Sequence, residues 1–176
     1  QIGYTYIFIT TNGGLATPER VKPVLDAGLD SIKFSISAGT RKSYRLIHGT
    51  DSFHTVLRNL AWVHRYRRRS GLAYRIYVTM VYTDATKHEV LLLKRKVAPF
   101  IDRWDPHQLN NQCGNLYENN SLGAIKQFSV RGRVTAAVCF QPFKGFTITP
   151  EGYLSACVLD YQKLLIVADL NKTSMK

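Results

Sequence analysis

The chain has 176 residues, of which 45% are hydrophobic, a proportion that is typical of globular proteins and excludes a disordered chain. Its longest apolar stretches, residues 78–82 and 164–168, are far shorter than the roughly 20 residues that span a bilayer, so we expect no membrane segment. The 24 Lys and Arg residues outnumber the 12 Asp and Glu residues, and the charge of +12 favours an anionic partner such as nucleic acid, acidic lipid or a phosphate-rich substrate.

Strands and helices are predicted to alternate through the first two thirds of the chain. The β-branched and aromatic residues 4–10 predict a strand that stops at Asn12-Gly13-Gly14, and Thr17-Pro18 predicts the start of a helix that ends at Gly28. Further strands are predicted at 31–36 and 74–82, a fourth opening at Gln108 and Leu109, and helices at 42–47, 52–66 and 87–100. This order indicates an α/β fold with parallel strands.

Polar residues are predicted to gather at the carboxyl ends of these strands. Thr11 and Asn12 follow the first strand, Ser35 and Ser37 end the second, and Thr83 follows the third. Functional residues of β/α folds lie at this edge, where the loops of neighbouring units converge. We therefore expect a site that is built from several strand ends.

The last third of the chain has a different pattern. Residues 114–132 are rich in Asn, Gly and Ser and lack periodicity, which predicts a linker. Residues 145–149 and 153–157, separated by a Pro-Glu-Gly turn, predict a β-hairpin. Cys139 precedes this hairpin and Cys157 ends it, and with no secretory signal the two are expected to be reduced thiols or metal ligands. The alternative is that both are buried as small apolar residues.

The one dense basic run is Arg65, Arg67, Arg68 and Arg69, directly after an apolar helical pattern. Cations in the last turn of a helix are favoured by its dipole, so the run is consistent with a solvated helix terminus. A contact with phosphate or RNA is the alternative.

Three segments, in this order, resemble the third and fourth strands of the radical S-adenosylmethionine (SAM) barrel and the segment after them. They are residues 7–15 (IFITTNGGL), 27–37 (AGLDSIKFSIS) and 40–49 (TRKSYRLIHG), and Ser37 stands where many members have an aspartate. The resemblance implies a partial (β/α) barrel with parallel strands over residues 1–109, followed by a linker over 110–138.

The same resemblance implies which residues bind SAM. Thr11, Asn12 and Ser35 would contact its ribose and amino acid parts through hydroxyl and amide groups, and Arg45 would pair with its carboxylate.

A second resemblance covers the end of the chain. Cys139, Gly152 and Cys157 form C-x12-G-x4-C, and Asp160 follows as C-x-x-D. Residues 164–174, which contain Asp169-Leu170-Asn171, are similar to a segment that normally reads Leu-Gly-Asn-Leu. This set resembles the start of the SPASM or Twitch auxiliary-cluster region, here residues 139–176, with its β-hairpin. It implies that Cys139 and Cys157 are ligands of a [4Fe-4S] cluster, while Cys113 lies outside the pattern.

Together, the resemblances imply an oxidoreductase that cleaves SAM reductively to a 5′-deoxyadenosyl radical and abstracts hydrogen from a peptide, sugar or other small substrate. They imply a cytoplasmic enzyme that receives electrons from a flavodoxin or ferredoxin, and the positive charge favours an anionic substrate. The family's C-x3-C-x2-C loop is absent from the sequence. We expect it to precede Gln1 in a longer protein, so this chain alone is expected to be inactive.

Two other functions fit the residues. A basic RNA or single-stranded nucleic-acid-binding module would use the arginine run with Tyr66, Tyr74 and Tyr77. A degenerate barrel that has lost its cluster loop would act as a scaffold for a partner.

Overall fold

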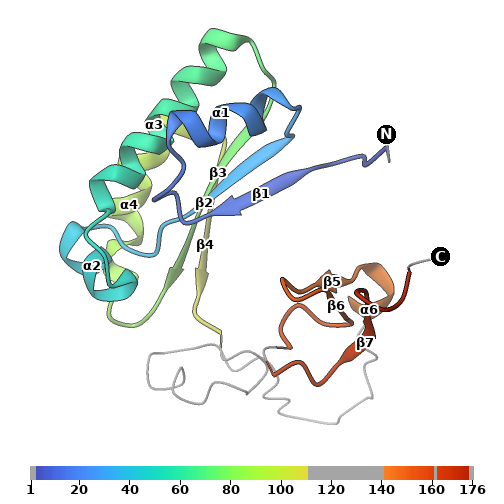
Figure 1. Cartoon of the computed structure of the whole chain (residues 1–176). Helices are drawn as coiled ribbons and strands as arrows, with labels where there is room; N and C mark the ends of the chain where they lie inside the picture. Colours follow the sequence, from blue (N-terminus) through green and yellow to red (C-terminus); the bar gives the residue numbers. More distant parts are fainter. Residues whose placement is uncertain (1–2, 111–140, 161, 175–176) are drawn as a thin grey trace. The chain divides into compact units, whose positions relative to one another are not determined.

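A computed structural model describes residues 3–110, 141–160 and 162–174. The chain divides into two compact units, Gln1–Gln108 and Leu109–Lys176, which are described separately (Figure 1). The predicted linker lies almost wholly outside the described residues, and so do Cys113 and Cys139.

The first unit is built on a four-stranded parallel sheet. Its strands are β1 (Phe8–Thr11), β2 (Ser31–Ser35), β3 (Arg75–Tyr82) and β4 (Arg103–Gln108), and they pair in the order β1-β2-β3-β4. This confirms the α/β fold with parallel strands and is consistent with part of a radical SAM barrel. Because consecutive strands are neighbours, their carboxyl ends form one continuous edge.

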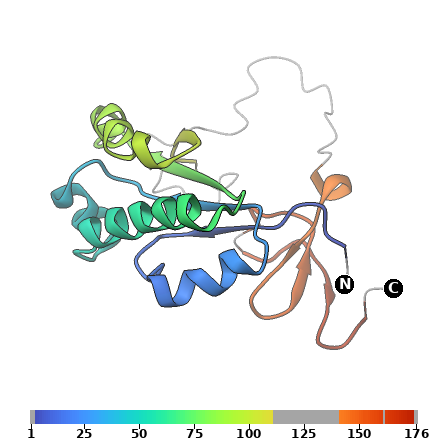
Figure 2. The same ribbon diagram turned by 90° about the horizontal axis from the view of Figure 1, so that it is seen from above.

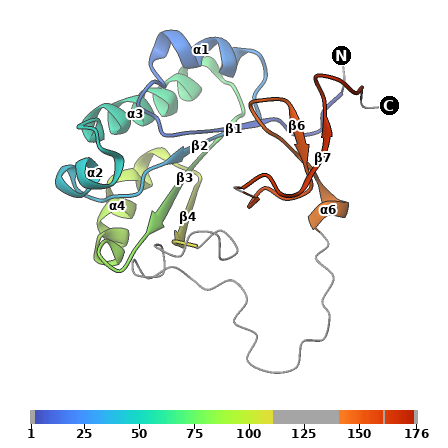
Figure 3. The same ribbon diagram turned by 60° about the horizontal axis from the view of Figure 1, so that its bottom comes forward.

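Helices cover one face of this sheet and leave the other face free of helices (Figures 1 and 3). They are α1 (Pro18–Asp26), α2 (Arg41–His48), α3 (Phe53–Ser70) and α4 (Val90–Val97), with single 3-10 turns at Lys87–Glu89 and Ala98–Phe100. Figure 2 shows α1, α3 and α4 following one another across the sheet. Among the described residues, none of these helices is long and apolar enough to cross a membrane.

The core lies between the sheet and its helices. Ile32 and Phe34 of β2, like Ile76 and Val78 of β3, are completely buried, and they meet Leu60 of α3 and its apolar neighbours. The residues between them on each strand point to the helix-free face. This alternation, with a period of two, decides which side chains reach each face of the sheet.

The helix ends follow the expected signals. The Thr40 side chain accepts the Ser43 N–H at the start of α2, and Gly49 and Gly71 end α2 and α3 in the left-handed conformation. The α3 helix runs to Ser70, beyond the predicted end at residue 66, so the arginine run forms its last turns.

The prediction that the fourth strand opens at Gln108 was wrong, because β4 begins at Arg103 and ends at Gln108. Its sequence, Arg-Trp-Asp-Pro-His-Gln, has few residues with a strand preference, and Pro106 removes one ladder donor. Among the described strands β4 is at the edge of the sheet, where one side of the ladder has no partner and a proline is tolerated.

The second unit contains a small antiparallel sheet of β5 (Thr147–Ile148), β6 (Tyr153–Ser155) and β7 (Ile166–Asp169), preceded by the short helix α6 (Gln141–Lys144). β5 and β6 pair around the Pro-Glu-Gly turn, as the sequence predicts. The sequence analysis did not anticipate that β7 adds a third strand beside β6.

Candidate functional site

The carboxyl ends of β1 and β2 place Asn12 and Ser35 at the same edge of the sheet. The two strands are parallel neighbours, with Thr10 opposite Lys33 and Thr11 opposite Phe34. Asn12 directly follows β1 and Ser35 is the last residue of β2. The Ser35 hydroxyl makes no hydrogen bond with any described residue, which leaves it available to a ligand.

The turn after β1 is held by its own side chains and by helix α3. The Thr11 hydroxyl accepts the Gly13 N–H at 3.0 Å, and Asn12 Oδ1 accepts the Gly14 N–H at 3.1 Å. From α3, the buried Asn59 donates its amide Nδ2–H to the Gly13 carbonyl at 2.8 Å. The Asn12 oxygen therefore has one of its two lone pairs engaged, and its Nδ2 group remains to donate to a ligand.

Gly13 is required at this turn for two reasons. Its φ of +78° lies in the left-handed region, which L residues with a side chain rarely adopt. A Cβ atom there would also lie 2.7 Å from the Phe34 ring and 2.9 Å from Val56. The turn thus rests directly on the core, and its backbone position is fixed.

The four predicted SAM-binding residues do not share one face. Ser35 points to the helix-free face, in register with Thr79. Thr11 is opposite the buried Phe34 and points to the helix-covered face. Arg45 is exposed on α2, close enough to the Asp51 carboxylate to contribute to lowering the pKa of Asp51, after the larger effect of the Arg41 hydrogen bond.

Sequence reasoning missed a polar cluster on the helix-free face, next to Ser35. Thr79 of β3 is almost fully buried; its hydroxyl donates to the Asp105 carbonyl at 2.8 Å and lies 2.8 Å from His107 Nε2. The Asp105 carboxylate is 3.7 Å from both His107 Nε2 and Arg103 Nη2. The signal was the alternation of Arg103, Asp105 and His107, which becomes visible once β4 is known to start at Arg103.

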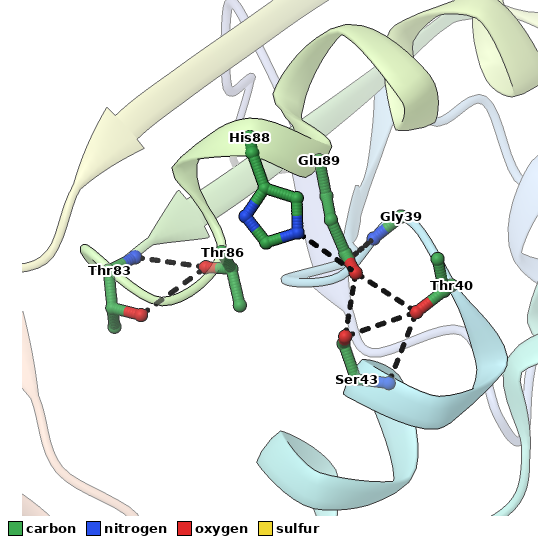
Figure 4. A network of polar contacts seen from close by, with 7 residues as sticks. All are labelled: Gly39, Thr40, Ser43, Thr83, Thr86, His88 and Glu89. Atoms are coloured by element: carbon green, nitrogen blue, oxygen red, sulfur yellow. Dashed lines mark hydrogen bonds and ion pairs between the residues drawn. The ribbon is translucent and has the colours of Figure 1, made fainter.

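The buried carboxylate of Glu89 joins the segment before α4 to the loop that follows β2 (Figure 4). Glu89, between β3 and α4, accepts hydrogen bonds from the Gly39 N–H at 2.6 Å, the Thr40 hydroxyl at 3.0 Å and the Ser43 hydroxyl at 2.6 Å. Burial alone would raise the pKa of Glu89, but these hydrogen bonds outweigh it and hold the pKa below its usual value. A Cβ on Gly39 would lie 2.8 Å from the Glu89 carbonyl oxygen, so the two loops pack at backbone distance.

In the second unit, the motif residues hold the loop that carries Cys157. The nearly buried Ser155 accepts the Cys157 N–H and donates to the Cys157 carbonyl, while the Asp160 carboxylate accepts the N–H groups of Leu164 and Leu165. The Cys157 side chain itself is half-buried.

Gly152, at the turn before β6, has a φ of +89°, and a Cβ there would meet the Asn171 amide at 2.6 Å. The motif glycine and the Asp-Leu-Asn segment are therefore in contact.

The described residues do not by themselves form a metal site. In residues 3–110, 141–160 and 162–174, no group of three or more His, Cys, Asp or Glu side chains is arranged to hold a metal ion. Cys139, the other thiolate that the sequence assigns to a cluster, lies outside the described residues, so its pairing with Cys157 stays a prediction.

Comparison with known proteins agrees with the geometry of the first unit. Residues 1–94 match the family model described as "Radical SAM superfamily". The chain is also 30% identical over 125 residues to the "Uncharacterized protein MJ0804" of Methanocaldococcus jannaschii. That alignment covers 67% of this chain and 42% of the relative, so the chain spans less than half of the relative's length. The family match covers more than half of the chain and leads to one conclusion: this chain belongs to the radical SAM superfamily.

Proposed function

We propose that this chain carries the carboxyl-edge part of a radical SAM active site, in an enzyme that takes a hydrogen atom from its substrate. The observation that carries the proposal is the row formed by Ser35, Thr79 and Asp105, which are in register on three adjacent parallel strands. Ligands of open parallel sheets bind at this edge, where loops converge. Polar side chains on this face suit the binding of a polar cosubstrate, whereas a face that packs in an apolar interior would carry apolar side chains.

Asn12 and Ser35 would hold SAM at this edge, and the chemistry that it would supply is hydrogen abstraction by a 5′-deoxyadenosyl radical, formed with release of methionine by one-electron reductive cleavage. The residues of this chain bind and orient it. The Asn12 amide keeps both N–H donors, which suit a ribose or carboxylate oxygen. The Ser35 hydroxyl can donate and accept, and His107, half-exposed beside Thr79, is within reach of the same ligand or the substrate.

The second unit is proposed to be the start of a SPASM or Twitch auxiliary region. Support comes from Gly152, whose positive φ and contact with Asn171 give the motif glycine a structural reason, and from the loop around Cys157 that Ser155 holds. Cys157 fits a thiolate ligand because it is half-buried, so a cluster bound there would be partly shielded from solvent. One thiolate does not make a cluster site, and no step of the reaction is assigned to this group.

The structure gives the nucleic-acid alternative little support. Arg67 donates to the Asp102 carboxylate and to a backbone carbonyl, so it serves the fold. Tyr74 is buried, with its hydroxyl donating to the Val63 carbonyl. Tyr77 points to the helix-free face, away from α3. Of the three tyrosines in this alternative, only Tyr66 lies on α3 with the arginines, and its hydroxyl donates to the Asp26 carboxylate. Bases that stack on aromatic side chains would need the other two rings beside the arginines as well.

Titration of the isotope-labelled chain with SAM, followed by NMR, tests the SAM site. We expect saturable shifts at the amides of Asn12 and Ser35, and a loss of affinity of about tenfold in Ser35→Ala, because one hydrogen bond to a charged or strongly polar group is removed. Ser70→Ala, at the far end of α3, is the matched control and should bind SAM like the wild type. Shifts that do not saturate, or equal losses in both variants, would contradict the proposal and favour the scaffold alternative.

Iron content tests the auxiliary region. After anaerobic reconstitution with iron and sulfide, the full-length protein that contains this chain should hold less iron by about one cluster when Cys139 and Cys157 are both replaced by Ala, because each cluster needs its thiolates. Cys113→Ser, which lies outside the motif, is the control and should retain the wild-type iron content. Equal iron in the double variant and the wild type would remove the cluster assignment while leaving the SAM site untouched.

A further inference from the structure

The helix-free face of the sheet carries a second row of polar side chains, which lies two residues nearer the amino ends of the strands than the row of Ser35. Lys33 of β2 is opposite Tyr77 of β3, and Tyr77 is opposite Arg103 of β4. These residues precede Ser35, Thr79 and Asp105 by two positions on each strand, so they share their face. A sheet face that only packs against another layer carries apolar side chains, and this row does not.

A pocket of about 160 Å³ opens at this row. It is lined by Tyr6, Phe8, Ser31, Lys33, Tyr77, Arg103 and Asp105. Three of these residues are aromatic, and hydroxyl, cationic and carboxylate groups are the polar part of the lining. It does not coincide with the edge residues that the sequence assigns to SAM.

The pocket has more positive than negative charge. Lys33 and Arg103 are cations, and Asp105 is the one carboxylate in the lining, 3.7 Å from Arg103. The Lys33 ammonium group has no carboxylate within 4.0 Å in the described parts of the chain, although the side chain is half-buried. Arg75, opposite Ser31 on the same face, adds a further positive charge nearby. A half-buried cation without a counter-charge favours an anion as its partner.

Hydroxyl groups complete the lining. The Tyr6 hydroxyl donates to Ser31 Oγ at 2.8 Å, and Ser31 is only 1% exposed. Hydrogen bonds with Ser31 first and then Tyr77 lower the pKa of Tyr6, so the three hydroxyl groups lie close together. Hydroxyl donors beside an ammonium and a guanidinium group are the set that binds the oxygens of phosphate or carboxylate groups.

We propose that this pocket binds an oxyanion group, phosphate or carboxylate, of the substrate, with Lys33 as its principal partner. The inference rests on the proposed function, because it assumes that the rest of the substrate reaches the row of Ser35 and Thr79. It assigns the enzyme an anionic substrate whose charged end lies nearer the amino ends of the strands than its reacting end. The exposed cations Arg65, Arg68 and Arg69 of α3 lie on the helix layer and take no part.

Titration of the labelled chain with inorganic phosphate, at constant ionic strength set with chloride, tests the pocket. We expect saturable amide shifts at Lys33, Tyr77 and Arg103. Lys33→Met keeps the aliphatic stem and removes the charge, so it should weaken phosphate binding about tenfold, the loss of one charge-assisted hydrogen bond. Lys33→Arg should restore most of the affinity. Acetate, titrated in parallel, decides whether the pocket prefers phosphate or carboxylate.

The control is Arg68→Met, which removes the same charge from the helix layer. Equal weakening by Lys33→Met and Arg68→Met would mean that phosphate follows net charge, and this outcome would overturn the proposal. So would wild-type affinity in Lys33→Met, or shifts confined to α3. If Lys33→Met fails to fold by its NMR spectrum, Arg103→Gln provides the same comparison from β4.

SAM binding separates this inference from the proposed function. A chain that binds SAM at Ser35 and shows no phosphate site at Lys33 keeps the proposed function and loses the pocket. A chain that binds phosphate at Lys33 but no SAM loses the proposed function. Lys33→Met is therefore titrated with both ligands, and loss of phosphate affinity with unchanged SAM affinity is the result we expect.

Discussion

Replacing Glu89 by glutamine should measure how strongly the two edge loops are joined. The carboxylate accepts three hydrogen bonds, from the Gly39 N–H and the Thr40 and Ser43 hydroxyls. In Glu89→Gln the amide oxygen can still accept the Gly39 N–H, and the two hydroxyls can turn to accept from the new NH2 group. What is lost is the charge on the acceptor, which makes each such bond stronger by roughly 1 kcal/mol. Over the three bonds we expect a loss of about 3 kcal/mol in the free energy of unfolding.

The pH dependence gives a second measure of the same carboxylate. The pKa of Glu89 is held below its usual value in the folded chain, so the stabilisation is fully present above about pH 4.3, the unperturbed pKa of glutamate, and is lost as the pH falls through the folded pKa. Glu89→Gln has no such group. The difference between wild type and variant should therefore be largest at pH 7 and shrink toward zero in strong acid.

Urea unfolding of wild type and Glu89→Gln, at pH 7 and at pH 3, measures the stability difference between the two chains and its change with pH. The control is Asp84→Asn in the same loop, an exposed carboxylate paired with Lys87 at 3.1 Å, and it should change stability by less than about 0.5 kcal/mol. Our reasoning would be refuted if Glu89→Gln were as stable as wild type at pH 7, or if the two chains lost stability in parallel on acidification.

Three further substitutions test other parts of the first unit. Gly13→Ala should lower the urea midpoint more than Gly71→Ala, because both positions have positive φ but only Gly13 faces crowded core atoms, which adds about 2 kcal/mol. Asn59→Ala should cost about 1 kcal/mol and speed hydrogen exchange in the turn, since it leaves the Gly13 carbonyl with only the longer, 3.3 Å bond from the Ala16 N–H. Burial raises the pKa of Tyr74 to about 12, so stability should fall from about pH 10 upward as the unfolded chain ionises first, and Tyr74→Phe should flatten that decline.

Most of the fold could be predicted from local sequence patterns. The alternation around Ile32 and Phe34 predicted β2 within one residue of its observed end, and the Asn-Gly-Gly turn predicted the end of β1. Period-two alternation and glycine turns are local signals that survive in one sequence. β4 was placed too late because its strand tendency comes from its neighbour β3 and not from its own residues.

The site was harder to predict because it depends on register between strands. Ser35 and Asn12 could be placed at one edge from the order of the elements alone. Thr11 points toward the helices because it is in register with the buried Phe34, and this register is known only from the structure. The contacts of Thr79 with Asp105 and His107 join residues on different strands, and the Gly39–Glu89 bond spans 50 positions. No spacing rule in a single sequence reports such pairs.

The bond from Asn59 to the turn after β1 also determines when that turn can take its final shape. The donor and the Gly13 carbonyl are 46 positions apart, and the Phe34 ring and Val56 side chain that support the turn come from β2 and α3. Closing such a loop costs chain entropy that is recovered only when α3 docks on the sheet. During synthesis from the amino terminus, the turn therefore cannot take its final shape until α3, about 40 residues further along the chain, has emerged and docked.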